Sequence, residues 1–227
     1  MSHPVSALVF DAYGTLFNVD SVIAACEDLF PGHGSALSHL WRTKQLQYSW
    51  LRSLMGRYVD FNQVTRESLQ VACQSLGLGY SEIVLTRLNQ AYRTLNIFDD
   101  TLPTLLRLRR QQPGVKLAIL SNGTEEMLNA VVAHNNLAVM FNAVLSVDEV
   151  GIFKPDRRVY QLACDRLQLS CDQIGFVSSN GWDAAGATAF GFTTFWINRA
   201  AAPIELLGVT PDRVVNSLAA LPALLTG

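Results

Sequence analysis

Near the N-terminus, a single carboxylate follows an apolar segment in a way that could support nucleophilic chemistry. Residues 5–10 are apolar and typical of a buried strand, and Asp11 comes directly after them. Gly14, three residues further on, gives the backbone the freedom to turn around this carboxylate. An isolated Asp with this spacing more often caps a turn, so the rest of the chain must decide between the two roles.

Three later segments also place polar side chains directly after apolar, strand-like runs. They add hydroxyls, amides, an amine and a second carboxylate to the first one. With Asp11, the set in chain order is Thr15, Ser121, Asn122, Lys154, Ser178, Asn180 and Asp183. In open parallel sheets, ligands bind outside the carboxyl ends of the strands. Four strand ends that meet at one edge with Asp, Ser, Lys and Asp favour a functional site over four unrelated loops.

The elements that must position these side chains alternate between helix and strand from residue 101 onward. The Lys154-Pro155-Asp156 segment is expected to open a helix that contains Tyr160. The expected strands cover residues 5–10, 115–120, 143–146, 174–177 and 193–197, with a last strand and helix within 214–225. Strands separated by helices in this order predict an α/β fold with a doubly wound, Rossmann-like parallel sheet and right-handed crossovers.

Between the first strand and this alternating region lies a segment that lacks strand signals. Residues 20–95 carry apolar side chains at i, i+3, i+4 and i+7, the spacing of amphipathic helices. The stripes are Leu51, Leu54, Met55 and Tyr58; Leu69, Ala72, Cys73 and Leu76; and Leu88, Ala91, Tyr92 and Leu95. We expect each stripe to face a core. The sequence therefore predicts a helical cap subdomain at residues 18–97, inserted into a core domain of residues 1–17 and 98–227.

The composition is that of one large domain, or of a domain with a sizeable insertion. The chain has 227 residues, of which 49% are hydrophobic and 16% charged, and its formal net charge is −2. This balance provides no basic field for nucleic acid or an anionic membrane surface, so neither partner is expected. No apolar run reaches the length of a signal or membrane segment, and the four cysteines lack C-x-x-C spacing. We expect a cytoplasmic protein with reduced thiols and no structural zinc.

Four motifs resemble those of the haloacid dehalogenase superfamily. They are Phe10-Asp11-Ala12-Tyr13-Gly14-Thr15-Leu16, Leu120-Ser121-Asn122-Gly123, Lys154-Pro155-Asp156 and Val177-Ser178-Ser179-Asn180-Gly181-Trp182-Asp183, and they span nearly the whole chain. Within the superfamily the sequence is most similar to the L-2-haloacid dehalogenases. Tyr13 stands two residues after Asp11, and a Ser-Ser-Asn-x-Trp-Asp stretch forms the last motif. The superfamily's phosphatases instead carry a second Asp at the position of Tyr13 and an acidic metal ligand at that of Ser179.

These two differences have a physical meaning. A phosphoryl group brings about two negative charges next to the nucleophile, so its transfer requires a divalent ion with hard oxygen ligands. With Tyr13 and Ser179 in place, too few carboxylates remain for such an ion, and no metal or other cofactor is expected. A haloacid is a monoanion, and two carboxylates about 4 Å apart repel by about 4 kcal/mol at an effective dielectric of about 20. A cation such as Lys154 could offset this repulsion and keep Asp11 ionised.

The resemblance implies a two-step hydrolysis of short L-2-haloalkanoic acids to D-2-hydroxy acids. Asp11 would first attack C2 with inversion to form an ester, while Arg42 and Asn122 hold the departing halide. Ser121 and neighbouring main-chain N–H groups would bind the substrate carboxylate. From the sequence alone, the choice of cap arginine stays open among Arg42, Arg52, Arg57 and Arg66.

In the second step, water would attack the carbonyl carbon of the ester. The residues expected to hold this water are Ser178, Asn180 and Asp183. Asp183 would act as the general base, although it could instead be a structural anchor for Lys154, and both roles could hold. Thr15 and Tyr160 are expected to orient Asp11 and Lys154, with simple packing of their hydroxyls as the alternative.

The resemblance also implies an apolar substrate pocket and a homodimer formed through cap helices. Arg42 and Leu46 lie four residues apart, so they share one helical face. The full set of expected pocket residues is Ala12, Tyr13, Arg42, Leu46, Phe61, Ser121, Asn122 and Trp182. Core packing is the alternative for each aromatic residue. Two other functions stay open, a Mg²⁺-dependent phosphatase of the superfamily and a non-catalytic binding module.

Overall fold

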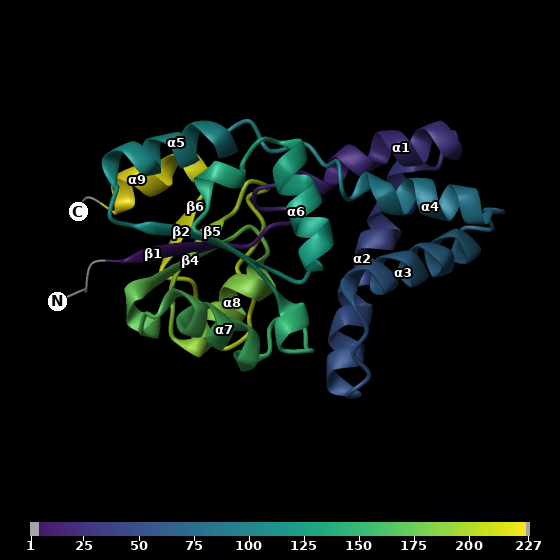
Figure 1. Ribbon diagram of the computed structural model, residues 1–227. Helices are drawn as coiled ribbons and strands as arrows, with labels where there is room; N and C mark the ends of the chain where they lie inside the picture. Colours follow the sequence, from purple (N-terminus) through teal and green to yellow (C-terminus); the bar gives the residue numbers. More distant parts are fainter. Residues whose placement is uncertain (1–4, 226–227) are drawn as a thin grey trace.

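A parallel sheet forms the centre of the protein, seen here in a computed structural model (Figure 1). The structure describes residues 5–225, and within them the sheet has six strands in the order β3-β2-β1-β4-β5-β6. The strands are β1 Ala7–Phe10, β2 Lys116–Ser121, β3 Ala143–Ser146, β4 Ile174–Ser178, β5 Thr193–Ile197 and β6 Arg213–Val215. All neighbouring pairs are parallel, so the predicted doubly wound α/β fold is confirmed.

Helices cover both faces of this sheet. Helices α5, α6 and α9 lie on one face, and α7 and α8 lie on the other (Figure 1). They are α5 Thr101–Gln111, α6 Glu125–His134, α7 Arg157–Leu167, α8 Gly181–Phe190 and α9 Leu221–Leu224. Short 3₁₀ turns occur at Val19–Ser21, Ala138–Met140, Val147–Glu149, Cys171–Gln173 and Leu218–Ala220. Within residues 5–225, none of the helices has both the length and the apolar character needed to cross a bilayer.

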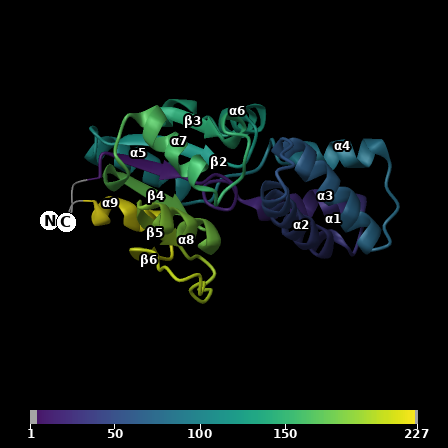
Figure 2. The ribbon, with the colours of Figure 1, turned by 90° about the horizontal axis from the view of Figure 1, so that it is seen from below.

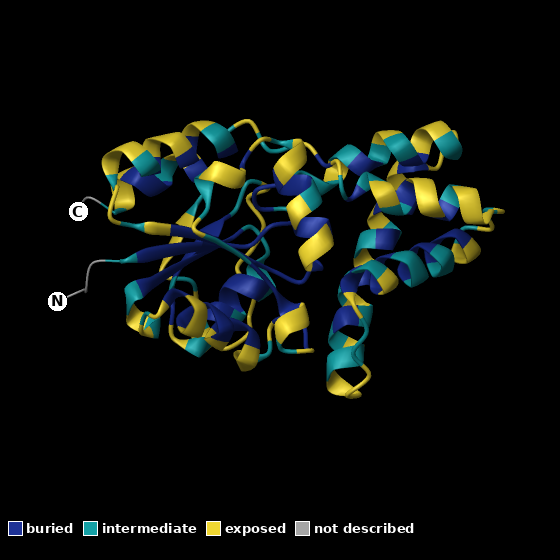
Figure 3. Cartoon of the chain, viewed as in Figure 1, coloured by how far each residue is buried: buried dark blue, intermediate teal, exposed yellow. Residues whose placement is uncertain are grey.

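The strand that leads into Asp11 lies in the buried centre of the sheet. Every residue of β1 is buried, as expected for a central strand that is covered on both faces (Figure 3). Strand β1 lies between β2 and β4, so the loop that begins at Asp11 emerges from the middle of the sheet. The apolar run that predicted this strand is thus explained by its central position.

The helical insertion lies beside the sheet, near its carboxyl edge (Figures 1 and 2). It contains α1 Val22–Leu29, α2 Gly34–Leu54, α3 Phe61–Ser75 and α4 Glu82–Ala91. Asp60 and Ser81 cap α3 and α4 by accepting hydrogen bonds from main-chain N–H groups of the first turn. The two chain crossings between sheet and insertion run together, since Asn18 N–H donates to Asn96 O at 2.7 Å. The proposed subdomain boundaries at 17/18 and 97/98 stay a prediction.

One of the three apolar stripes does not face a core. The stripes that begin at Leu69 and Leu88 are largely buried, but Leu51, Leu54 and Met55 are 51%, 84% and 63% exposed. The expectation that they pack inside was wrong, because helical spacing predicts an apolar face and not what covers it. The C-terminal end of α2 projects past the other helices of the insertion (Figure 1).

Helix α7 begins later than expected, at Arg157, with Asp156 as its N-cap.

Candidate active site

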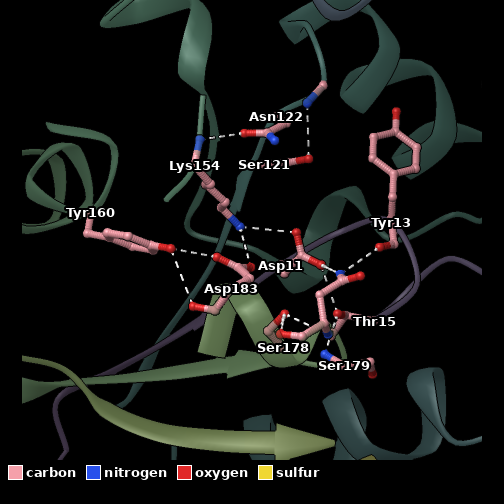
Figure 4. Close-up of polar contacts among 12 residues, drawn as sticks. Asp11, Tyr13, Thr15, Ser121, Asn122, Lys154, Tyr160, Ser178, Ser179 and Asp183 are labelled. Atoms are coloured by element: carbon pink, nitrogen blue, oxygen red, sulfur yellow. Dashed lines mark hydrogen bonds and ion pairs between the residues drawn. The ribbon is translucent and has the colours of Figure 1, made fainter. Parts of the chain in front are cut away.

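The loops at the carboxyl ends of β1, β2 and β4, with the loop after β3, bring the predicted polar side chains together (Figure 4). Asp11 lies at the centre of this group. The loop that carries it turns back at Gly14, whose φ of +89° belongs to the left-handed region that favours glycine. Gly14 N–H donates to Phe17 O at 2.8 Å and closes the turn. The isolated carboxylate of the sequence is therefore part of a compact polar cluster.

Lys154 lies between two carboxylates in this cluster. Its Nζ is 3.1 Å from Asp11 Oδ1 and 2.9 Å from Asp183 Oδ2, and its side chain is 1% exposed. Burial by itself would lower the pKa of Lys154, but the two carboxylates outweigh burial and raise it. The amine therefore stays protonated and offsets negative charge beside Asp11.

Asp183 is completely buried behind Lys154. Besides the ion pair, it accepts a hydrogen bond from the Tyr160 hydroxyl at 2.8 Å on Oδ1. Burial raises the pKa of Asp183 to about 6, although Lys154 acts in the opposite direction. The Tyr160 hydroxyl thus bonds to Asp183 and not to Lys154, which corrects the expected orienting contact. Gly186, one turn along α8, makes room for this hydroxyl, since a Cβ there would lie 2.5 Å from it.

The second oxygen of Asp11 is held by two donors. Oδ2 accepts from Thr15 Oγ1 at 2.9 Å and from Asn180 Nδ2 at 2.8 Å. Thr15 Oγ1 in turn accepts from Ser179 N–H at 2.8 Å, and the buried Ser178 Oγ accepts from Asn180 N–H at 3.1 Å. Oδ2 is therefore fixed in place, whereas Lys154 is the sole donor to Oδ1 among residues 5–225.

Ser121 and Asn122 extend the cluster from β2. Ser121 Oγ accepts from Gly123 N–H at 3.2 Å, and Asn122 Oδ1 accepts from Lys154 N–H at 3.0 Å. Within the described part of the chain, the Ser121 hydroxyl proton and the Asn122 Nδ2 amide have no acceptor. Both side chains keep donors that a bound anion could use.

A small, tightly lined cavity of about 10 Å³ lies beside Asp11. It lies between the polar cluster and helices of the insertion. Its lining comprises Asp11, Tyr13, Arg42, Leu46, Phe61, Ser121, Asn122, Asn180 and Trp182. All the predicted pocket residues except Ala12 are among these. The remaining predicted site residues, which lie behind this lining, are Thr15, Lys154, Tyr160, Ser178 and Asp183.

Arg42 is separated from the competing cap arginines by its environment. Arg52 and Arg66 form ion pairs with Glu67 and Glu82, and Arg57 is exposed and outside the lining of the cavity. No carboxylate of residues 5–225 lies within 4.0 Å of the Arg42 guanidinium, whose contact is with the amide Gln45 Oε1 at 3.5 Å. Arg42 therefore offers the cavity a positive charge that no carboxylate in the described part of the chain neutralises.

Aromatic side chains form the apolar wall of the cavity. The Tyr13 and Phe61 rings are stacked at 6.2 Å between centroids, and Trp182 packs edge-on against Trp50 at 5.3 Å. The Tyr13 hydroxyl is buried with no hydrogen-bond partner among residues 5–225, and the same holds for the Trp182 indole N–H. Because an unpaired buried donor costs free energy, the Tyr13 hydroxyl in the cavity lining suits a ligand with acceptor groups.

Several supporting residues lie outside the sequence motifs and were not predicted. Gln45 is buried and accepts from Tyr92 at 3.0 Å while it contacts Arg42. Trp50 packs on Trp182 as described. Arg199, far from every motif, donates to residues of two site loops. The one sequence signal for Gln45 is its position on the helical face of Leu37 and Trp41, and nothing marks Arg199 in the sequence.

Acidic, His and Cys side chains are sparse around Asp11. Within residues 5–225, no three His, Cys, Asp or Glu side chains group together as potential metal ligands. Asn180 Nδ2 donates to both Asp11 Oδ2, at 2.8 Å, and Tyr13 O, at 3.2 Å. An amide thus bridges two oxygens that could otherwise share a cation, and Lys154 supplies the positive charge instead.

With this geometry in hand, the chain can be compared with known proteins. A model of the haloacid dehalogenase-like hydrolase family matches residues 5–191, and the protein belongs to this family. An (S)-2-haloacid dehalogenase of Pseudomonas sp. strain YL is 49% identical to it over 96% of this chain and 93% of that relative. (S)-2-haloacid dehalogenase H-109 of Pseudomonas putida is 47% identical over 95% of both chains.

The solved structures agree with these relatives. The L-2-haloacid dehalogenase of Xanthobacter autotrophicus with chloropropionic acid covalently bound superposes with a TM-score of 0.92. It is 41% identical, over 98% of this chain and 99% of that one. The family resemblance predicted from the motifs is confirmed, and the phosphatase alternative is not favoured.

Proposed function

We propose that this protein hydrolyses short L-2-haloalkanoic acids to D-2-hydroxy acids with inversion at C2, through an ester of Asp11. One observation carries the proposal. A carboxylate paired with Lys154 and an arginine that has no carboxylate partner among residues 5–225 line the same small cavity. The activities named for the 47% and 49% identical relatives support it, as does the covalently bound chloropropionic acid in the structural neighbour.

In the first step, Asp11 Oδ1 attacks C2 and the carbon–halogen bond breaks. Oδ1 is the more nucleophilic of the two oxygens, because it accepts one hydrogen bond whereas Oδ2 accepts two. The halide leaves with the bonding electron pair toward Arg42 and the free amide of Asn122. The Ser121 hydroxyl binds the substrate carboxylate. No proton has to be supplied to the halide, which agrees with an aromatic residue at position 13.

In the second step, water attacks Cγ of the Asp11 ester. Negative charge develops on the ester carbonyl oxygen, which is the former Oδ2. Thr15 Oγ1 and Asn180 Nδ2 already donate to this oxygen, so they act as its oxyanion hole. The bond between Cγ and Oδ1 then breaks, and the proton that Asp183 took from the water reaches Oδ1 through Lys154, which contacts both oxygens. The product leaves with Oδ1 as its hydroxyl oxygen, and the second proton of the water is released as Asp11 returns to a carboxylate.

Asp183 serves as the base for this water. Formation of the ester removes the charge of Asp11, so Lys154 then balances Asp183 alone and keeps it ionised. The ion pair of 2.9 Å also makes Asp183 the anchor of Lys154, so both roles belong to one side chain. Ser178, through the main chain of Asn180, holds the loop beside which the water binds.

The reaction requires no metal ion. The amide of Asn180 bridges Asp11 and Tyr13 O, and the cationic amine of Lys154 balances Asp11, which supports this part of the proposal. Activity that persists in excess chelator agrees with it. Hydrolysis of an aryl phosphate that disappears with chelator would favour a phosphatase instead.

The protein acts as a cytoplasmic homodimer. The exposed stripe of Leu51, Leu54 and Met55 on α2 supports association with a second copy, because large apolar side chains gathered on a surface mark interfaces. The four free cysteines support a reducing compartment. Light scattering of the protein and of its Leu54→Asp variant tests the dimer, and a monomeric parent protein would contradict it.

A single turnover in ¹⁸O water tests the ester mechanism. With enzyme in excess over L-2-chloropropionate, the label should enter the carboxylate of Asp11, and the lactate should be unlabelled. Label that appears only in the product would show direct attack by water. Halide release from a panel of L- and D-2-haloacids, run with and without chelator, tests the substrate class.

A further inference from the structure

Arg199, in the segment after β5, binds three parts of the chain at once. Its Nη1 donates to Ser179 Oγ at 2.7 Å, and its Nη2 donates to Thr15 O at 3.2 Å and to Asp100 Oδ1 at 2.9 Å. The guanidinium also lies 4.1 Å from the centroid of the Phe98 ring. One side chain thus joins the loop after β1, the loop after β4 and the start of α5.

Asp100 holds Arg199 in this position. Its Oδ2 accepts from Ser217 Oγ and from Leu218 N–H, both at 2.8 Å, which leaves Oδ1 for the arginine. Partial burial would raise the pKa of Asp100, but Arg199, Ser217 and the Leu218 N–H outweigh it and lower the pKa. The carboxylate is therefore ionised at neutral pH and fixed by three partners.

The groups that Arg199 holds lie next to the hydrogen bond that fixes the nucleophile. Thr15 uses its carbonyl for Arg199 and its hydroxyl for Asp11 Oδ2, at 2.9 Å. Ser179 uses its hydroxyl for Arg199 and its main-chain N–H for Thr15 Oγ1, at 2.8 Å. Both residues are thus tied to Arg199 at one end and to the Asp11 contact at the other.

We propose that Arg199, oriented by Asp100, is a positioning residue for the dehalogenation. It holds Thr15 and Ser179 so that the Thr15 hydroxyl keeps its hydrogen bond to Asp11 Oδ2. This inference rests on the proposed function. Because Thr15 donates to the oxygen that becomes the ester carbonyl, loss of Arg199 slows hydrolysis of the ester more than its formation.

The planar guanidinium is essential to this role. It presents several N–H donors in a fixed fork, whereas a lysine at the same position presents one flexible point charge. An Arg199→Lys variant keeps the charge beside Asp100 but cannot serve Ser179, Thr15 and Asp100 together. Asp100→Asn provides a second variant, in which the arginine is intact and only its orientation is loosened.

Rapid-quench single turnovers with L-2-chloropropionate test the proposal. Halide release reports ester formation, and lactate release reports ester hydrolysis. We expect the hydrolysis rate constant to fall by about 10- to 100-fold in R199K, and less in D100N, with a smaller effect on halide release. Mass spectrometry should then detect the ester on Asp11. The matched control is Arg157→Lys, an exposed arginine that stacks on Phe190 and donates to Ala189 O, away from the cavity.

Each other outcome overturns the inference. Rate constants in R199K and D100N that equal those of R157K would show that Arg199 has no positioning role. Equal slowing of both steps, or a lower burst amplitude with unchanged rate constants, would indicate general disturbance or misfolding instead. A parent protein that releases halide from no haloacid would overturn the proposed function, and this inference with it.

Discussion

The loops of the sheet and the helical insertion differ in whether the charged side chains that face the site have partners. In the sheet loops, Lys154 is buried between Asp11 and Asp183 and offsets part of their negative charge. In the insertion, Arg52 is neutralised by a glutamate, whereas Arg42 lines the cavity without a carboxylate partner within residues 5–225. The sheet thus balances a nucleophile before substrate arrives, and the insertion keeps one positive charge for an incoming anion.

This division suits a displacement at carbon. The nucleophile and the leaving group must lie on opposite sides of the reacting carbon, so they are most easily served by two separate parts of the fold. In the proposed mechanism, rigid strand ends hold the attacking oxygen, and α2 supplies the cation for the halide. The predictions below test whether the two regions differ in this way.

The largest expected effect is the loss of the nucleophile from the sheet. Asp11→Asn should reduce halide release by at least about 10⁴-fold, because an amide cannot form the ester. Initial rates of halide release measure this. Slow deamidation back to Asp would appear as activity that grows with time, so mass spectrometry of the residue-11 peptide is the control. Full initial activity in a verified Asn variant would exclude Asp11 as the nucleophile.

Removal of Lys154 should damage both catalysis and stability. Lys154→Met leaves two buried carboxylates without their cation, so we expect the free energy of unfolding to fall by about 3–5 kcal/mol. Turnover should fall by about 10²- to 10⁴-fold. Urea unfolding curves measure the first quantity and halide release the second. The matched variant Arg42→Met, which breaks no ion pair, should change stability by no more than about 0.5 kcal/mol. Equal destabilisation by both variants would contradict the contrast between the two regions.

A change in the insertion should depend on the leaving group. Arg42→Gln should lower the rate of ester formation by about 10²- to 10³-fold, with a larger loss for L-2-chloropropionate than for the bromo analogue. Chloride is the poorer leaving group and depends more on the cation. Arg66→Gln, in an exposed ion pair, is the control. The same loss for both halogens would assign Arg42 to the substrate carboxylate instead of the halide.

The smallest effect is a shift in the pH profile. Asp183 must be ionised to act as base in ester hydrolysis, so the rate constant of that step is lost as the pH falls through the pKa of Asp183. This pKa is about 6 while Asp11 is ionised, and it is lower in the ester, where the charge of Asp11 is gone. The Tyr160 hydroxyl stabilises the ionised form. Tyr160→Phe should therefore raise the pKa and move the acid limb of the single-turnover rate constant for ester hydrolysis to higher pH. Tyr80→Phe, at the surface, should leave the limb in place, and an unmoved limb in both variants would argue against Asp183 as the base.

Much of this architecture follows from local sequence. Residues 143–146 and 193–197 are strands with the predicted bounds, because short apolar runs between turn signals specify strands through local pattern alone. The same pattern places polar side chains at strand ends, and parallel strands bring those ends to one edge. The fold class, the family and the collection of site loops around Asp11 could therefore be read from the sequence.

The tertiary structure decided which partner each charged side chain has and what packs against each apolar helical face. Leu54 continues a helical stripe in the sequence but lies at 84% exposure, since its burial depends on what α2 packs against. Asp11 and Lys154 are 143 positions apart, and Thr15 and Arg199 are 184 apart. Local spacing carries no information on such pairings, because they form only when the strands have ordered themselves in the sheet. Sequence by itself determined which groups could react, and packing decided which of them are neutralised, which stay free and what holds them still.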